Sequence, residues 1–409
     1  SLFETAAGLA PQFIEPIVHL ANLAARQSDW DGAETLSNRA LSIDPKNYAA
    51  RACLVNIEIA RSHFQRAEGL LRPLLAAKAP TPYDAAFVRG LLGDLRHAQQ
   101  LYSQAFAAYA SCNREQVELY RDRFDLPGVS ASNYCKWLGS HFSRVTVTVE
   151  RNDADKVISH VFLVGFPRSG TTLLENVLAA NPIVEALEER DTLGDLTRRY
   201  LTDADGLARF HALTGAELEA ARAAYWKRVQ EYTDHLDGKC LLDKYPLNSM
   251  KLPLIAKLFP SAKILFAARD PRDVVLSCFR RMFNMNTSMF ELLDLERAAH
   301  FYDAVMGLSM IYRKNLSLAW RDVRHETLVE DFERETRDIC QFIGIPWDTG
   351  MLEFAERAKN RTIRTPSSTQ VVRGLNSDSL GQWRNYNKQL DCVLPILEPW
   401  VKHWNYPTH

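Results

Sequence analysis

The spacing of hydrophobic and polar positions changes along the chain. Up to about residue 120, Ala and Leu recur at helical spacing, which predicts helices throughout. From Lys156 onward, short apolar runs alternate with helical stretches, and the strand candidates are residues 160–164, 240–242 and 263–267. This alternation predicts a parallel sheet that helices cover on both faces.

The change of pattern divides the chain into three predicted parts. Residues 1–120 form an all-α domain, residues 121–155 a connector rich in turn signals, and residues 156–409 an α/β domain. Residues 137–142 of the connector form a short helix, and its aromatic side chains need burial, so we expect the connector to pack between the domains. Helical patterns of the α/β domain lie at residues 171–180, 214–236, 249–258, 272–281, 292–315 and 332–342.

The helical domain also contains a repeat. Ala33 and Ala67 are 34 residues apart, and Ala67 and Ala105 are 38 apart, an excess that we assign to Pro80-Thr81-Pro82. A period of 34 with small residues at helix crossings is the tetratricopeptide pattern. A generic helical bundle is the alternative, because the Trp and Tyr of the consensus are largely missing.

Composition narrows the function classes. The net charge is −1, so no overall field favours nucleic acid or an anionic membrane. The seven cysteines are scattered and none forms a Cys-x-x-Cys pair, which argues against a disulfide framework and a zinc site. We therefore expect a cytoplasmic protein without a metal. There is no apolar run of 18 residues and no signal peptide, although a segment could precede the opening Ser.

The first stretch that carries chemistry is residues 161–172, VFLVGFPRSGTT. An apolar strand ends at Gly165, four residues lead to Gly170, and a helical pattern follows. Such a loop holds an anion with backbone N–H groups at a helix N-terminus. Nucleotide triphosphatases carry a Lys after the second Gly. Here Thr171 stands in that place and the positive charge is at Arg168. The loop therefore suits a phosphate-like group but lacks the Lys that binds the β- and γ-phosphates of a triphosphate.

The second stretch is residues 264–283, ILFAARDPRDVVLSCFRRMF. Arg269 follows an apolar strand, and Ser277 comes two helical turns later. We predict that they bind a second phosphate at the same sheet edge. For Arg272 and Asp273 we expect a surface helix whose charges are solvated or bridge each other.

FPRSGTT followed by RDPRDVVLS resembles the donor-binding motifs of sulfotransferases. The pair is most similar to the tyrosylprotein sulfotransferases and to bacterial sulfotransferases fused to tetratricopeptide repeats. The resemblance covers roughly residues 156–406, and nearly the whole chain with the repeats. It implies an α/β P-loop-like sulfotransferase domain that uses 3′-phosphoadenosine 5′-phosphosulfate (PAPS), releases 3′-phosphoadenosine 5′-phosphate (PAP) and needs no metal.

The resemblance also assigns the donor-binding residues. Those of the 5′-phosphosulfate loop are Arg168, Ser169, Gly170, Thr171 and Thr172. The 3′-phosphate contacts are Arg269 and Ser277, with Arg281 added, and Ser367 and Arg373 are further phosphate contacts near the C-terminus. The sequence departs from the tyrosylprotein enzymes at Gln382, where they have Lys, and at His325, where they have Tyr, so the adenine contacts stay open.

Three residues are assigned to the chemistry by the same resemblance. Glu189, the second of a Glu-Glu pair, is the catalytic base; an exposed acid at a helix start is the alternative. Lys244 lies beside the donor's bridging oxygen; a structural Lys paired with Asp243 is the alternative. Arg168 stabilises the sulfuryl oxygens.

The acceptor is a hydroxyl on protein tyrosine, carbohydrate or another small molecule, and the sequence does not choose among them. Residues 200–236 and 285–312 are expected to wall its pocket. Two rival functions remain: a P-loop small-molecule kinase, and a non-catalytic repeat scaffold with a donor-binding domain. The repeats suit a protein or peptide partner; the alternatives are that they cap the catalytic domain or form a homodimer.

Overall fold

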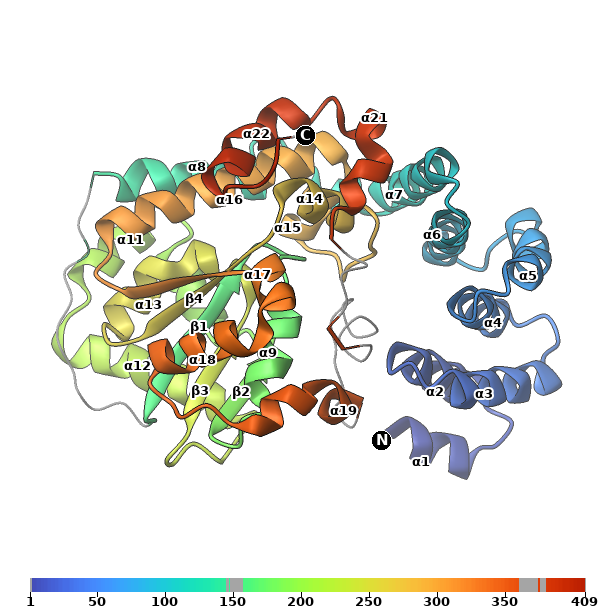
Figure 1. The fold of residues 1–409 in the computed structure, drawn as a ribbon, viewed down its shortest axis with the longest axis horizontal. Coiled ribbons are helices and arrows are strands. Elements are labelled where there is room, and N and C mark those ends of the chain that lie inside the picture. Colours follow the sequence, from blue (N-terminus) through green and yellow to red (C-terminus); the bar gives the residue numbers. More distant parts are fainter. Residues whose placement is uncertain (1, 145–146, 148–156, 360–373, 376–379, 409) are drawn as a thin grey trace.

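The computed structural model describes residues 2–144, 147, 157–359, 374–375 and 380–408. The N-terminal part of the protein is helical (Figure 1). Its helices are α1 (Leu2–Leu9), α2 (Ile14–Arg26), α3 (Trp30–Ile43), α4 (Tyr48–Ala60), α5 (Phe64–Ala76), α6 (Pro82–Ala98), α7 (Tyr102–Phe124) and α8 (Ala131–Phe142).

Helices α2 to α7 form three consecutive pairs: α2 with α3, α4 with α5, and α6 with α7. The first helices of the pairs begin 34 residues apart, at Ile14, Tyr48 and Pro82. The turn inside each pair repeats as well, because its middle residue has a left-handed backbone with φ of 60°, 62° and 62° at Ser28, Ser62 and Gln100. The predicted helix pairs are therefore confirmed, and their tetratricopeptide assignment stays a prediction.

The irregular spacing of the third pair has a different origin from the one we expected. Helix α6 begins on the 34-residue period, behind a capping box formed by Thr81 and Asp84. It contains 17 residues, whereas α4 contains 13. The additional residues amount to about one helical turn. The excess therefore lies within α6, and its assignment to residues 80–82 is wrong.

The third pair belongs to two hydrophobic cores. Leu91 and Leu95 of α6 pack with residues of α4 and α5. Ala105 and Tyr109 of α7 instead join the large core on one face of the sheet. Figure 1 shows the pairs following an arc that meets the sheet-containing part beside α14 and α21. The predicted boundary at residue 120 falls inside α7. Since Ala105 and Tyr109 pack in the large core, this helix contributes to the core of the α/β part.

Five parallel strands form one sheet in the order β2-β3-β1-β4-β5. The strands are β1 (Ser159–Gly165), β2 (Val184–Glu188), β3 (Cys240–Lys244), β4 (Lys263–Ala268) and β5 (Ala319–Arg324). The three inner strands are the ones that the sequence predicts. The two edge strands escaped prediction because they are partly exposed and carry charges such as Glu185 and Arg321. An all-helical region followed by a parallel sheet with helices confirms the predicted fold.

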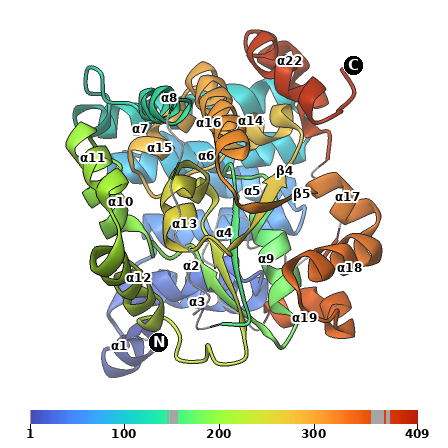
Figure 2. The ribbon, with the colours of Figure 1, turned by 90° about the vertical axis from the view of Figure 1, so that its left-hand side faces the viewer.

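The remaining helices cover both faces of the sheet (Figure 2). They are α9 (Thr171–Ala179), α10 (Gly194–Tyr200), α11 (Ala204–Ala212), α12 (Gly215–Gln230), α13 (Leu252–Leu258), α14 (Pro271–Phe279), α15 (Thr287–Phe290), α16 (Leu295–Asn315), α17 (His325–Glu330), α18 (Phe332–Ile343), α19 (Phe354–Lys359), α21 (Asn387–Leu390) and α22 (Leu394–His403), with the 3₁₀ helices η1 (Pro246–Lys251), η2 (Glu291–Leu293), η3 (Thr349–Glu353) and η4 (Gln382–Tyr386). Among the described residues, none of these helices combines the length and apolar character that crossing a membrane requires.

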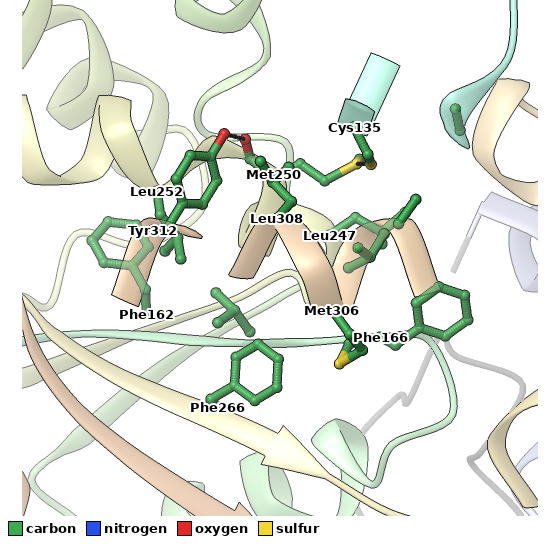
Figure 3. Packing of buried hydrophobic residues seen from close by; sticks show 14 of the residues in the cluster. Cys135, Phe162, Phe166, Leu247, Met250, Leu252, Phe266, Met306, Leu308 and Tyr312 are labelled. Atoms are coloured by element: carbon green, nitrogen blue, oxygen red, sulfur yellow. Dashed lines mark hydrogen bonds between the residues drawn. The ribbon is translucent and has the colours of Figure 1, made fainter. Parts of the chain in front are cut away.

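Strand β1 is buried on both faces of the sheet. Phe162 belongs to the larger core and its neighbour Leu163 to a smaller core on the opposite face. Figure 3 shows the larger core, where Phe162 and Phe266 of the sheet lie near side chains of α16. From α16, the Tyr312 hydroxyl donates a hydrogen bond to the carbonyl oxygen of Met250 at 3.2 Å. This packing holds the carboxyl end of β1 in a fixed place.

Candidate active site

The carboxyl ends of the five strands lie along one edge of the sheet because the strands are parallel. Each strand places a different polar element there. In sheet order these are Glu189 after β2, Lys244 at the end of β3, the loop 166–170 after β1, Arg269 after β4 and His325 after β5. This edge is the candidate active site.

The loop between β1 and α9 leaves no room for side chains at its two glycines. A Cβ on Gly165 would lie 2.6 Å from the carbonyl oxygen of Ala267, and one on Gly170 would lie 2.7 Å from Nδ1 of His325. Gly170 also has a φ of 95° and directly precedes α9. The first N–H groups of a helix are left without intrahelical partners, so the loop fits a phosphate or sulfate group. The other predicted loop residues are buried around it: Arg168, Ser169, Thr171 and Thr172.

The side chain of Arg168 lies on the α14 side of the loop. Its Nε donates a hydrogen bond to Oγ of Ser277 at 3.0 Å. Burial and then the positive charge of Arg281 lower the pKa of Arg168 to about 9. A guanidinium whose pKa falls in this way is surrounded by net positive charge in a desolvated place, which suits an anionic ligand.

Arg269 and Arg281 lie in the same cluster. Nη1 of Arg269 donates to the carbonyl oxygen of Arg168 at 3.4 Å, and its Nη2 is 3.8 Å from Oδ2 of Asp273. Nη1 of Arg281 is 3.7 Å from Oδ2 of Asp94, which belongs to α6 of the helical region. Both ion pairs are long. The predicted 3′-phosphate residues are thus brought together, and Arg168, which we had assigned to the other phosphate, is placed among them.

Lys244 forms the second half of the edge. The Lys244 side chain is 0% exposed, and its Nζ donates to Oε1 of Glu189 at 2.9 Å and lies 3.2 Å from Oε2 of Glu175. Burial lowers the pKa of Lys244, but the carboxylates of Glu175 and Glu189 outweigh burial and leave that pKa above its ordinary value. Lys244 is therefore a buried ammonium held between two carboxylates.

Glu189 extends the edge of the sheet by one residue. Its backbone N–H donates to the carbonyl oxygen of Lys244 at 2.9 Å, and its φ is 44°. The side chain is 38% exposed, which leaves it open to an incoming group. Glu189 follows strand β2, so the alternative of an acid at a helix start is wrong. Arg168 and Glu189 are also non-glycine residues with positive φ, a costly conformation that persists where the surrounding structure imposes it.

Asp243 does not pair with Lys244. It accepts hydrogen bonds from the hydroxyls of Thr192 at 2.6 Å and Tyr225 at 2.9 Å. Adjacent residues of a strand point to opposite faces of the sheet, and burial raises the pKa of Asp243 to about 6. The alternative of a structural Lys244–Asp243 pair is therefore wrong.

The sequence of this edge matches a known family. The model of the sulfotransferase family matches residues 160–349, which include the carboxyl ends of all five strands. Residues 160–349 form a sulfotransferase-family domain.

Relatives of this sulfotransferase domain include eukaryotic enzymes. Protein-tyrosine sulfotransferase A of Caenorhabditis elegans is 26% identical over 63% of this chain and 70% of its own length. Protein-tyrosine sulfotransferase 1 of Danio rerio is 26% identical over 61% of this chain and 72% of its own. An uncharacterized protein of Aquifex aeolicus is 26% identical over 60% of this chain, which spans only 33% of that protein. The relationship to the tyrosine enzymes is distant.

Among solved structures, the sulfotransferase domain of the Synechococcus PCC 7002 olefin synthase resembles this chain with a TM-score of 0.41. The two are 21% identical over 62% of this chain and 98% of that one.

One charged residue of the candidate site was missed by our sequence reasoning. Glu175 lies on α9, is 2% exposed and contacts Lys244. It comes four residues after Thr171, which places both on the same face of the helix. An acidic residue one turn into a buried helix was the available signal, but its partner, Lys244, is distant in sequence.

Helix α14 of the sulfotransferase domain is buried, which corrects our expectation for Arg272 and Asp273. The guanidinium of Arg272 pairs with Asp270 at 2.7 Å and stacks on the ring of Trp383, 3.7 Å from its centroid. Asp273 accepts the backbone N–H groups of Gly381 and Trp383 at 2.7 and 2.9 Å. Arg272 and Asp273 thus fix η4 against the domain, and the surface helix that we expected is wrong.

Of the remaining predicted positions, two lie outside the described part of the chain and two lie within it. Ser367 and Arg373 lie outside the described residues. Gln382 begins η4. His325 is buried against Gly170, and burial and then the charge of Arg269 lower the pKa of His325 to about 3, so this imidazole is neutral. A neutral imidazole adds no charge to the guanidinium cluster.

All seven cysteines of the chain are free thiols, and six of them are buried. Within the described ranges, no group of three or more His, Cys, Asp and Glu side chains is arranged to hold a metal ion.

Proposed function

We propose that this chain transfers the sulfuryl group of PAPS to an acceptor hydroxyl. The observation that carries the proposal is the division of one sheet edge into two halves. A buried guanidinium cluster lies on one side of a loop that fits a phosphate or sulfate group, and a buried ammonium between two carboxylates lies on the other side. In this proposal the loop and the guanidinium cluster take the two phosphate positions of the donor, one of them bearing sulfate, and the ammonium with its carboxylates lies on the side where the acceptor would react.

The residues present fit such a donor. The narrow loop at Gly165 and Gly170 and the N-terminus of α9 would hold the 5′-phosphosulfate. The 3′-phosphate would be held by Arg269, Ser277 and Arg281. The guanidinium of Arg168 would bind either the 3′-phosphate or the 5′-phosphosulfate in the loop. Guanidiniums bind phosphate oxygens strongly in a desolvated place. When bound, the donor would supply an activated sulfuryl group.

Two side chains carry the proposed chemistry. Glu189 would accept the proton of the acceptor hydroxyl, a contribution of roughly 10²–10⁴ in rate for general-base catalysis. Lys244 would place a positive charge where negative charge develops on the leaving oxygen. Its fixed position between Glu175 and Glu189 means that little reorganisation is needed during the reaction.

The acceptor belongs to the class of hydroxyl compounds, with protein tyrosine, carbohydrate and other small molecules as candidates. The C. elegans and D. rerio relatives are named as protein-tyrosine sulfotransferases, which places tyrosine peptides first among those to try. The three helix pairs would recruit a protein or peptide acceptor, because stacked helix pairs present a concave surface.

A transfer assay tests this function. The protein is incubated with PAPS carrying labelled sulfate and with panels of tyrosine peptides, sugars and small hydroxyl compounds. We expect label in at least one acceptor, and a loss of about 10²–10⁴ in rate in Glu189→Gln. PAP binding without transfer to any acceptor class would favour the non-catalytic scaffold instead. Transfer that Glu189→Gln leaves unchanged would contradict the proposed base.

The small-molecule kinase is the weaker rival. It needs a Lys after the second loop glycine to reach the β- and γ-phosphates, and Thr171 occupies that position. Lys244, the buried lysine of this edge, is enclosed by carboxylates at the other side of the loop. ATP hydrolysis or phosphate transfer dependent on Mg²⁺ would revive this rival.

A further inference from the structure

Glu175 is a buried carboxylate to which the proposed chemistry has so far given no part. It is 2% exposed and its Oε2 lies 3.2 Å from Nζ of Lys244. Lys244 has a second carboxylate partner, Glu189, on its other side. The two carboxylates differ in exposure, since the Glu189 side chain is 38% exposed while Glu175 is enclosed. Two counter-ions for one lysine need an explanation.

We infer that Glu175 is a positioning residue that keeps Lys244 protonated and in place at the moment when Glu189 becomes neutral. This inference rests on the proposed function, in which Glu189 is the base. It assigns to the site a residue whose partner is Lys244 rather than donor or acceptor.

The argument follows from the charge balance during transfer. Glu189 takes the proton released as the acceptor's O–H bond breaks and its oxygen bonds to sulfur. Lys244 supplies positive charge for the oxygen that leaves with the electron pair of the broken sulfur–oxygen bond. At that moment Glu189 is neutral and no longer balances the positive charge of Lys244. A buried ammonium without a counter-ion is costly and tends to release its proton, which would remove the charge when it is needed.

Glu175 prevents that loss. The charged groups that face Lys244 are Glu175 from α9, and Glu189 and Glu188 from the end of β2. The negative charge of Glu175 is the largest single cause that raises the pKa of Lys244, ahead of the charge of Glu189 and the hydrogen bond to Glu189. Glu175 lies on a helix packed against the sheet, with its Oε2 3.2 Å from Nζ of Lys244, so it remains beside the ammonium while the more exposed Glu189 changes its protonation state.

The test measures the protonation of Lys244 directly, without donor or acceptor. The side-chain ¹³Cε and ¹⁵Nζ signals of Lys244, assigned by their loss in Lys244→Arg, are followed from pH 6 to 10. The variants are Glu189→Gln, which mimics the neutral base, Glu175→Gln, and the double variant. Glu58→Gln is the matched control, because Glu58 is another buried carboxylate on the distant helix α4. Circular dichroism checks that each variant is folded.

We expect Lys244 to stay protonated through pH 8 in Glu189→Gln. In the double variant we expect the proton affinity of Lys244 to be at least tenfold lower than in Glu189→Gln. Glu175→Asp should restore part of that affinity if the double variant proves unstable. Lys244 titrating at the same pH in Glu189→Gln and in the double variant would overturn the inference. This outcome is separate from the proposed function, because it needs no turnover.

Steady-state kinetics add a second readout once an acceptor is in hand. In Glu175→Gln we expect kcat to fall about tenfold with the KM for PAPS within twofold, and the alkaline limb of the kcat profile to move to lower pH. A kcat and pH profile equal to those of Glu58→Gln would contradict the role. Absence of transfer in every variant would count against the proposed function, while the titration of Lys244 would still decide the role of Glu175.

Discussion

At the scale of single residues, the candidate site contains backbone positions with strained or crowded geometry. Gly170 combines a φ of 95° with close contact to the His325 imidazole. Arg168 within the loop, and Glu189 after β2, have positive φ without being glycines. Conformations of this kind cost on the order of 1–3 kcal/mol each and persist where the surrounding structure imposes them. We therefore expect the loop geometry to be the most sensitive part of the proposed donor site.

Gly170→Ala tests this sensitivity. The new Cβ would meet Nδ1 of His325 at 2.7 Å, so either the loop or the imidazole must move. We expect PAP affinity to fall at least tenfold, by calorimetry, with a loss of about 1–3 kcal/mol in the free energy of unfolding. Gly215→Ala is the matched control, because Gly215 has a φ of 52° but open space around it. Equal PAP affinity in both variants would show that the loop is not the binding surface.

At the scale of elements, the inner strands and the loop could be predicted from the sequence and the edge strands could not. Strand β1 is apolar throughout because both of its faces are buried. Strand β5 shows little burial and holds charged residues, so its pattern resembles that of a loop. For the same reason the sequence did not reveal that His325 lies beside Gly170. The sequence therefore indicated the polar residues at the ends of the inner strands, but not the contacts that depend on an edge strand.

Helix α14 shows a second limit of the sequence pattern. Its Arg and Asp residues suggest a solvated face, yet Arg272 and Asp273 are buried because Trp383 and Gly381 cover them from the far end of the chain. Likewise, the sequence could not show that Glu175 and Lys244 meet, since 69 positions separate them. Buried charge pairs of distant residues depend on the tertiary arrangement rather than on local pattern.

At the scale of the whole molecule, the helical region and the sulfotransferase domain share a helix pair. Ala105 and Tyr109 of α7 lie in the large core, and Asp94 of α6 pairs with Arg281 at the proposed donor site. The hydroxyl of Tyr109 donates to Asp94 at 2.8 Å, which fixes that carboxylate. Asn113 of α7 donates to the carbonyl oxygen of Phe279 at 2.9 Å. The third pair is therefore a structural part of the proposed donor site.

Two deletions separate the roles of the helix pairs. Removing residues 1–46 leaves α4 with its Asn47 cap, and we expect a soluble protein whose PAP affinity stays within about twofold, because helix pairs in such stacks contact mainly their neighbours. Removing residues 1–124 takes α7 out of the core, and we expect aggregation. Size-exclusion chromatography and calorimetry measure both. A fragment of residues 125–409 that is monomeric and binds PAP would contradict the claim that the two parts of the molecule share the third helix pair.

The most direct test of the central claim compares two ligands that differ only in the 3′-phosphate. Calorimetry with PAP and with adenosine 5′-phosphate should show that the wild type binds PAP about 100-fold more tightly, since charged hydrogen bonds contribute roughly 1.5–3 kcal/mol each. Arg269→Ala should remove most of that difference, while Arg337→Ala, which alters an exposed arginine paired with Glu333, should not. Equal affinity for the two ligands, or PAP binding undiminished in Arg269→Ala, would contradict the account.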